Sequence, residues 1–175
     1  MTIDICFIGK GGSELFAEAE KRYLKLSAPH AKISLLPVWN VVIDKAQKIG
    51  AAQAREAYSQ AFASSSLSLA SRLSPKNLPR LSPASIAAQS SRYLIALSEE
   101  GELYNSFDFA KLVANRAAFS FYIGGAYGLD RAFCGLCDRV ISLSPLTFSH
   151  EIARIVLLEQ LYRAFTIESK HPYHK

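Results

Sequence analysis

The feature that most constrains the fold is the alternation of short apolar runs with helical segments along the chain. The runs are rich in Ile, Leu, Val and Phe and end at glycine or polar residues, as buried strands do. We expect strands at Thr2–Gly9, Lys32–Val38, Arg92–Leu97, Phe119–Ile123 and Val140–Leu143. Strands that alternate with helices favour a mainly parallel sheet flanked by helices, so the fold class is α/β.

The segments between these runs carry helical signals. Ser13 can cap a helix that runs to about Leu26, and Pro29 stops it. The other expected helices are Lys45–Ser64, Phe107–Asn115, Asp130–Cys137 and Ser149–Phe165. The last has an apolar face, turned to the core or to a partner, made of Ile152, Ile155, Val156, Leu158, Leu161 and Phe165.

The segment from about 64 to 91 differs from the rest in composition. It is rich in serine and contains Pro75, Pro79 and Pro83. Prolines at this spacing exclude a regular helix, so we expect an irregular loop or insert. Its charged residues are all basic, which allows a solvated loop or an electropositive arm for RNA. A polar turn is expected at Ser98–Glu102.

Length and composition bound the class of protein. The 175 residues, half of them hydrophobic, fit one domain spanning 1–175. The apolar stretch Ile152–Leu158 is broken by Arg154 and is short of the roughly 20 residues that span a bilayer. Asp4 interrupts the first apolar run, so we expect no signal peptide. Three cysteines are too few for a disulfide framework, which favours the cytoplasm.

Two short motifs could indicate dinucleotide binding and a zinc or redox site, but their sequence context argues against both functions. Gly124-Gly125 with Gly128 would let backbone amides approach a ligand, but the full dinucleotide-binding fingerprint and its acidic partner are missing. A nicotinamide-dependent oxidoreductase is therefore disfavoured. Cys134 and Cys137 supply half of a zinc site and lie too late in the chain for a redox motif, so no metal site is predicted.

The C-terminal region gathers His, Tyr and Arg. His150 follows the run Ser144-Pro145-Leu146-Thr147-Phe148-Ser149, and Tyr162-Arg163-Ala-Phe165 precedes the ending His171-Pro-Tyr173-His174-Lys175. Such side chains bind phosphates, stack on bases and move protons. The net charge of +5 permits an anionic partner without requiring one. A tail that merely packs on its own domain is the alternative.

These residues resemble a known family. Tyr162-Arg163-Ala-Phe165, the ending Pro172-Tyr173-His174-Lys175 and the turn Tyr122-Ile123-Gly124-Gly125 are similar to the ribosomal large-subunit pseudouridine methyltransferases called RlmH. The resemblance is nearly continuous from about Tyr93 to Lys175 and thinner before it. It departs at Ser149, where the family usually has proline, and in the long segment 64–91.

The resemblance implies a trefoil-knotted domain of the SPOUT class, S-adenosyl-L-methionine (SAM) as cofactor, and a homodimer with composite active sites. By position, Leu97 and Gly125 would contact SAM, and the loop Ser144–Ser149 would wrap its adenine. It implies that these side chains face the RNA or the methyl group: His150, Arg154, Tyr162, Arg163, Tyr173 and His174, with Lys175 beside them.

The resemblance also implies the reaction, which is methylation of N3 of a pseudouridine in helix 69 of 23S rRNA within assembled ribosomes. His150, His174 or Tyr173 could accept the N3 proton while Arg154 and Arg163 orient the target. The sequence does not choose among them. The rival functions are a knotted methyltransferase acting on another RNA, such as tRNA, and a non-enzymatic ribosome-binding factor.

Overall fold

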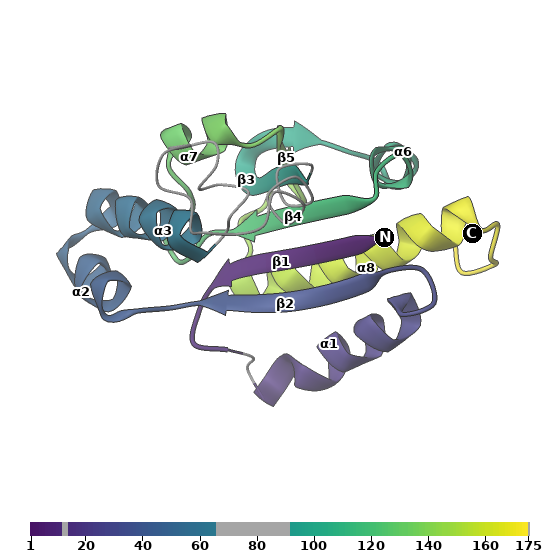
Figure 1. Cartoon of the computed structure of the whole chain (residues 1–175), viewed down its shortest axis with the longest axis horizontal. Helices are drawn as coiled ribbons and strands as arrows, with labels where there is room; N and C mark the ends of the chain where they lie inside the picture. The colour runs from purple at the N-terminus through teal and green to yellow at the C-terminus, as the bar shows by residue number, and fades with distance from the viewer. Residues whose placement is uncertain (12–13, 66–91, 175) are drawn as a thin grey trace, which may run out of the picture.

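A computed structural model describes residues 1–11, 14–65 and 92–174 (Figure 1). Most of the serine- and proline-rich segment falls outside the described residues. Within them lies a five-stranded sheet of order β2-β1-β4-β3-β5, with every neighbouring pair of strands parallel. The expected α/β class with a mainly parallel sheet is thereby confirmed. The strands are β1 (Thr2–Ile8), β2 (Lys32–Val38), β3 (Tyr93–Leu103), β4 (Ala118–Ile123) and β5 (Arg139–Ser142).

Side chains alternate between the two faces of the sheet, and both faces are covered. Ile3, Ile5 and Phe7 of β1 pack in one cluster with α6 (Ser106–Ala114) and α8 (His150–Glu168). Cys6 and Ile8 pack in the other, with residues of α2 (Val41–Ile49), α3 (Ala51–Ser65) and α7 (Arg131–Leu136). Burial on both faces explains why the strands read as continuous apolar runs.

Helix α1 (Glu14–Ser27) lies beside α8 on the first face, and α6 lies against α8 as well. Among the described helices, none combines the length and apolar composition that crossing a bilayer requires. Strand β2 is at an edge of the sheet, a position that tolerates Pro37 because a strand lies on only one of its sides.

The single helix expected at Lys45–Ser64 is wrong, because the chain forms two helices there. Gly50 separates α2 from α3 with φ 156°, a conformation that side-chain-bearing residues rarely adopt. Its N–H still donates to Ala46 O, which ends α2. Asn40 begins α2 by accepting a hydrogen bond from the Ile43 N–H.

The polar turn expected at Ser98–Glu102 is also wrong, because β3 continues through these residues. Ile141 pairs first with Leu97 and, after a register shift, with Glu102. Gly101 permits this arrangement, since a Cβ there would lie 2.5 Å from the Ile141 carbonyl carbon. The polar and charged residues of the segment favoured a turn, whereas the chain continues as a strand that pairs with β5 a second time. The trefoil knot stays a prediction.

Candidate active site

The carboxyl ends of β3, β4 and β5 lie side by side at one edge of the sheet. Leu97 pairs with Ile123 of β4 and with Ile141 of β5. Gly125 follows β4 closely, and the loop Ser144–Ser149 follows β5. Open parallel sheets bind ligands at this edge. The fold thus brings to one edge the residues that the sequence predicted for the cofactor.

The glycine turn between β4 and α7 favours glycine for two reasons, which are close contacts at Gly124 and Gly125 and a positive φ at Gly128. The Gly128 N–H donates to Gly125 O at 3.0 Å, and Gly128 has φ 70°. A Cβ at Gly124 would lie 2.7 Å from the Gly128 carbonyl carbon. These glycines are required by the turn itself, and their backbone groups remain at the carboxyl edge.

Hydroxyl side chains shape the loop Ser144–Ser149. The Ser142 hydroxyl donates to Ser144 O at 2.8 Å, and the Leu146 N–H donates to Ser144 Oγ at 3.0 Å. The Thr147 hydroxyl donates to Glu99 Oε2 at 2.8 Å, which links the loop to β3. Leu146 is 71% exposed, so the loop presents an apolar side chain to solvent.

The end of the same loop begins α8. The Ser149 side chain accepts a hydrogen bond from the Ile152 N–H at 3.3 Å and so caps the helix. Pro145 and Ser149 are exposed, whereas Phe148 is half-buried. Ser149 therefore has a defined structural role in this chain as the N-cap of α8.

His150 lies where the start of α8 meets the end of β1. A Cβ at Gly9 would lie 3.8 Å from His150 Nε2 and 3.6 Å from the Phe7 ring, so the turn after β1 packs directly against the imidazole. Partial burial lowers the pKa of His150, Glu151 opposes this effect, and Arg154 adds to it. A neutral imidazole at this edge can accept a proton.

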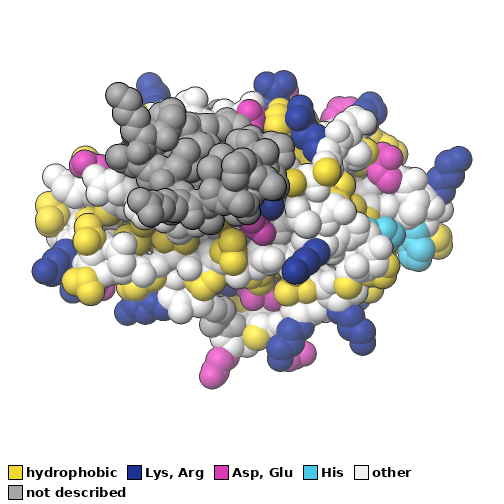
Figure 2. All heavy atoms as spheres, in the orientation of Figure 1, with side chains coloured by type: hydrophobic (Ala, Val, Ile, Leu, Met, Phe, Trp, Pro, Cys, Tyr) yellow, Lys and Arg dark blue, Asp and Glu magenta, His cyan; other side chains and the backbone are white. Residues whose placement is uncertain are grey.

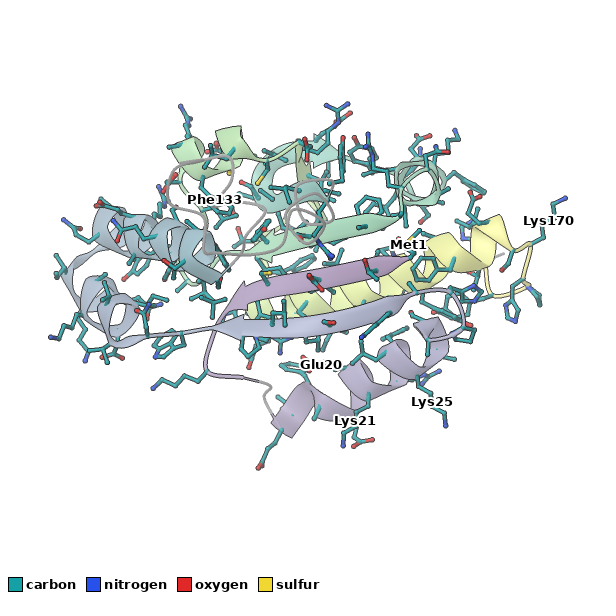
Figure 3. All side chains as sticks on the ribbon, in the orientation of Figure 1. Met1, Glu20, Lys21, Lys25, Phe133 and Lys170 are labelled. Carbon is teal, nitrogen blue, oxygen red and sulfur yellow. The ribbon has the colours of Figure 1, made fainter. Side chains whose placement is uncertain are left out.

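Arg154 is fully buried, one helical turn further along α8. Its Nε donates to Glu20 Oε1 at 2.5 Å, and its guanidinium lies 4.1 Å from the Phe7 ring centroid. Figure 3 shows Glu20 on α1 directed toward the sheet, whereas Lys21 and Lys25 point outward. Arg154 thus joins α8, α1 and β1 and does not reach the surface of this chain.

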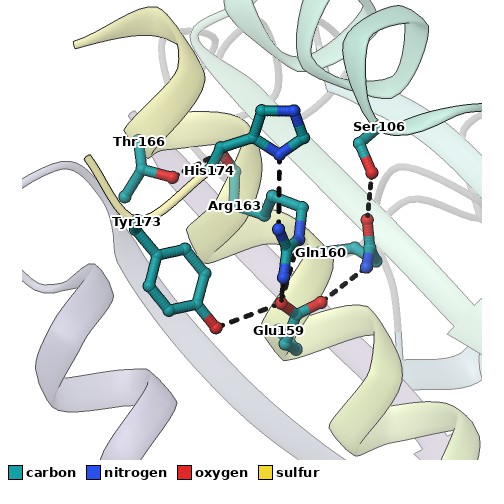
Figure 4. Close-up of polar contacts among 7 residues, drawn as sticks. All are labelled: Ser106, Glu159, Gln160, Arg163, Thr166, Tyr173 and His174. Carbon is teal, nitrogen blue, oxygen red and sulfur yellow. Dashed lines mark hydrogen bonds and ion pairs between the residues drawn. The ribbon is translucent and has the colours of Figure 1, made fainter. Parts of the chain in front are cut away.

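The C-terminal tail folds back onto α8 (Figure 4). Glu159 Oε1 accepts hydrogen bonds from Arg163 Nε at 3.0 Å and from the Tyr173 hydroxyl at 3.1 Å. His174 Nδ1 lies 3.3 Å from Arg163 Nη1, and its ring meets Phe107 edge-on at 4.8 Å. Burial, followed by hydrogen bonds, raises the pKa of Tyr173 to about 12.

Tyr162 belongs to the same cluster. It is 7% exposed and its ring meets Tyr173 at 4.7 Å, so its side chain mainly supports the tail. Lys175 lies outside the described residues. The tail cluster therefore consists of Glu159, Tyr162, Arg163, Tyr173 and His174.

The predicted site residues fall into two groups at opposite ends of α8. The first, which we call the donor group, consists of Leu97, Gly125 and the loop Ser144–Ser149 (the donor loop) at the carboxyl edge beside His150. The second is the tail cluster around Arg163. At 1.5 Å per residue, the helix separates these positions by roughly 20 Å. Figure 1 shows α8 running behind the sheet toward the C-terminus, where the tail lies. Within one chain, the tail does not cover the loop Ser144–Ser149.

Residues of α3 at the glycine turn were not anticipated. Arg55, Tyr58 and Ser59 contact this turn across long stretches of sequence. The composition of the helix gives no signal for these contacts, since only the fold brings α3 to the turn. Among the described residues, no group of His, Cys, Asp and Glu could hold a metal ion.

An open parallel sheet whose candidate residues converge at its carboxyl edge defines an α/β domain with a candidate ligand-binding edge. Comparisons with known proteins identify the family. The model of the family described as "Predicted SPOUT methyltransferase" matches residues 1–174. The chain belongs to the SPOUT methyltransferase family and, within it, groups with the relatives named ribosomal RNA large subunit methyltransferase H.

Relatives with that name match this chain along its length. The protein from Aliarcobacter butzleri is 36% identical over 175 residues, which is 100% of both chains. The protein from Nitratiruptor sp. is 39% identical over 99% of this chain and 98% of its own. The protein from Campylobacter jejuni subsp. jejuni is 36% identical over 100% of both.

A solved structure supports the fold. The structure of a probable methylase family protein from Haemophilus influenzae Rd KW20 aligns with a TM-score of 0.54 at 16% identity. The alignment covers 99% of this chain and 70% of that chain. At this identity the likeness concerns the fold alone.

Proposed function

We propose that this chain is a SAM-dependent methyltransferase that methylates N3 of a pseudouridine in helix 69 of 23S rRNA. The observation that carries the proposal is the full-length match to relatives named ribosomal RNA large subunit methyltransferase H. Since the substrate is the assembled ribosome, the protein acts in the cytoplasm. The methyl donor and the target nucleotide go beyond the family assignment. We infer both from the resemblance of the C-terminal residues to the RlmH methyltransferases.

The carboxyl edge suits the methyl donor. Leu97 offers apolar contact, and Gly125 offers backbone groups. The backbone of the loop Ser144–Ser149, which serine hydroxyls hold in place, is proposed to hydrogen-bond the adenine ring. Bound SAM supplies an electrophilic methyl group on its sulfonium. The chain's own task is to hold donor and acceptor in line, an arrangement that lowers the barrier of a two-reactant step substantially.

His150 is the group that we assign to the proton of N3. As the new N–CH₃ bond forms, the S–CH₃ bond of the donor would break and leave S-adenosylhomocysteine. The N–H bond of the base must also break, and its proton must pass to an acceptor. His150 adjoins the donor loop, and its lowered pKa keeps the imidazole neutral at neutral pH. Arg154, which is buried beside it, acts as a positioning residue.

A homodimer completes the active site in this proposal. The donor group and the tail cluster are separated along α8, so a second copy with its α8 crossing in the opposite sense would bring its tail to the first copy's donor loop. Ile152, Ile155 and Val156 form an incompletely buried apolar stripe on α8 that suits such a contact. The tail residues Tyr173 and His174, with Arg163, would then face the RNA, while the buried Tyr162 supports Tyr173 from behind.

On the face shown in Figure 2, the described residues form no alternative RNA site. Its Lys and Arg side chains are scattered among acidic ones, and apolar side chains gather over α2. Val41, Val42 and Ile49 of α2 are 68%, 58% and 70% exposed. A binding surface for RNA requires clustered positive charge, which the described residues of this face do not present.

The test uses ribosomes from a strain that lacks the enzyme and SAM labelled with tritium in its methyl group. We expect the label in 23S rRNA at one pseudouridine of helix 69, found by mapping the labelled nucleotide. Label in tRNA alone would move the assignment to another RNA. Absence of both label and SAM binding by calorimetry would leave a ribosome-binding factor and refute the proposal.

A further inference from the structure

One face of α3 contacts the glycine turn at successive points. Arg55 Nε donates to Tyr127 O at 2.6 Å, and the Ser59 hydroxyl donates to Asp130 Oδ2 at 2.5 Å. Tyr58 lies between these two residues, against Gly125. Residues spaced by three and four share one face of a helix, so all three side chains contact the turn region from the same face of α3. We call Arg55, Tyr58 and Ser59 the α3 clamp.

Tyr58 fixes the position of the Gly125 backbone. Its side chain is fully buried, and its hydroxyl accepts a hydrogen bond from Gln47 Nε2 at 2.6 Å. A Cβ at Gly125 would lie 2.7 Å from the Tyr58 hydroxyl oxygen and 3.1 Å from Ile8 Cγ2. The Gly125 backbone is therefore held between α3 and β1, and no other residue fits without movement.

The two flanking contacts extend this hold along the turn. Asp130 also accepts a hydrogen bond from the Phe133 N–H and so caps α7, which ties Ser59 to the helix after the turn. The Tyr127 hydroxyl donates to Gln47 O at 3.4 Å, which ties the turn to α2. The turn is thus fastened to α2, α3 and α7.

We propose that the α3 clamp sets the affinity for the methyl donor by positioning the Gly125 backbone. This inference rests on the proposed function, in which Gly125 contacts SAM. A backbone contact cannot adapt by a change of rotamer, so its strength depends on where the turn is held. The clamp residues touch the turn from the side of α3, and they are positioning residues rather than catalytic ones.

The experiment measures donor binding and turnover separately in the full chain. Arg55→Met removes the bond to Tyr127, and Tyr58→Phe removes the hydroxyl that abuts Gly125. We expect each to raise the Kd for S-adenosylhomocysteine and the KM for SAM roughly tenfold. We expect kcat at saturating SAM and the KM for ribosomes to stay within about twofold, since the transfer step itself is untouched.

Glu56→Gln is the matched control, because Glu56 neighbours Arg55 but contacts Gln60 on its own helix. It should bind donor as the wild type does. Arg55 is exposed, so Arg55→Met tests the proposal even if Tyr58→Phe folds poorly. Wild-type donor affinity in folded Arg55→Met would overturn the clamp. Failure of the wild type to bind SAM would instead overturn the proposed function.

A second pair of variants tests the steric coupling directly. Gly125→Ala should abolish measurable donor binding, because its methyl group meets the Tyr58 hydroxyl and displaces the turn. Adding Tyr58→Leu makes room, so the double variant should regain a measurable part of the lost affinity. If the double variant binds no better than Gly125→Ala alone, Tyr58 does not control the turn and the proposal fails.

Discussion

Among single residues, His150 and Tyr173 differ most clearly in what they can do with a proton. Partial burial lowers the pKa of His150, whereas burial and hydrogen bonds raise the pKa of Tyr173 to about 12. Tyr173 therefore stays protonated at neutral pH and donates to Glu159. The sequence could nominate both residues by type, but only their surroundings distinguish an acceptor from a donor.

The pH dependence of methyl transfer tests the role of His150. A His whose pKa is lowered loses its acceptor only when the pH falls through that lowered value, so the acid limb of kcat should lie below the usual value of about 6.5. His150→Gln should remove this limb and lower kcat about a hundredfold. Single-turnover assays with ribosomes across the acid range give the profile.

His30→Gln provides the control for that profile. His30 is exposed and stacks on Phe165 at 5.5 Å, near the other end of α8. Its substitution should leave the acid limb in place. An unchanged limb in His150→Gln would show that another group takes the proton.

The buried pair of Arg154 and Glu20 gives a prediction on stability. Removing the carboxylate in Glu20→Gln leaves the buried guanidinium without a counter-charge, which should lower the free energy of unfolding by about 3–5 kcal/mol. Lys21→Gln removes only the exposed pair with Glu18 and should change it by less than about 1 kcal/mol. Urea unfolding measures both. A loss below about 1 kcal/mol in Glu20→Gln would show that the buried guanidinium of Arg154 does not depend on Glu20 as its counter-charge.

At the scale of elements, the apolar strands could be predicted closely because both of their faces are buried. The expected strand Phe119–Ile123 differs by one residue from the buried β4 (Ala118–Ile123). The expected strand Lys32–Val38 matches β2 in both bounds, although this edge strand is only partly buried. The errors fell where tertiary structure overrides composition. Gly50 breaks an alanine-rich stretch that reads as one helix, and Ser98–Glu102 looks like a turn but continues β3. The hydrogen bond from Arg55 to Tyr127 O joins distant parts of the chain, so no local sequence pattern predicts it.

The close contact between Gly101 of β3 and the Ile141 backbone of β5 gives a prediction on stability, with Gly135 as the comparison. Gly101→Ala places a Cβ 2.5 Å from the Ile141 backbone, which cannot rotate away, so we expect a loss of about 3 kcal/mol in unfolding free energy. At Gly135 in α7, nothing described lies within 4 Å of the added Cβ. Gly135→Ala should therefore stabilise the protein by about 0.5–1 kcal/mol.

Thermal and urea unfolding of the two variants measure this contrast. Both substitutions add the same methyl group, so the difference between them isolates the steric effect of the β5 backbone. Equal stability of the two variants would mean that β3 and β5 can separate at Gly101, and would remove the explanation for glycine at that position.

At the scale of the whole molecule, the separation of the two groups of site residues matters most. The sequence could nominate the donor loop and the tail, since both carry recognisable residue types. It could not tell whether they meet within one chain, because that depends on the direction in which α8 runs between them. The structure gives α8 from His150 to Glu168, with the tail folded back at its far end.

A heterodimer of two inactive variants tests whether the active site is shared between subunits. One chain carries His150→Ala and the other carries Tyr173→Ala with His174→Ala, each with its own affinity tag, and passage over both affinity columns isolates the mixed dimer. If each site combines the donor loop of one chain with the tail of its partner, one of the two sites contains no substitution. The mixed dimer should then show about half of the wild-type rate, while each variant homodimer stays inactive. If each site lies within one chain, both sites of the mixed dimer carry a defect and no activity returns, which would rule out the shared site.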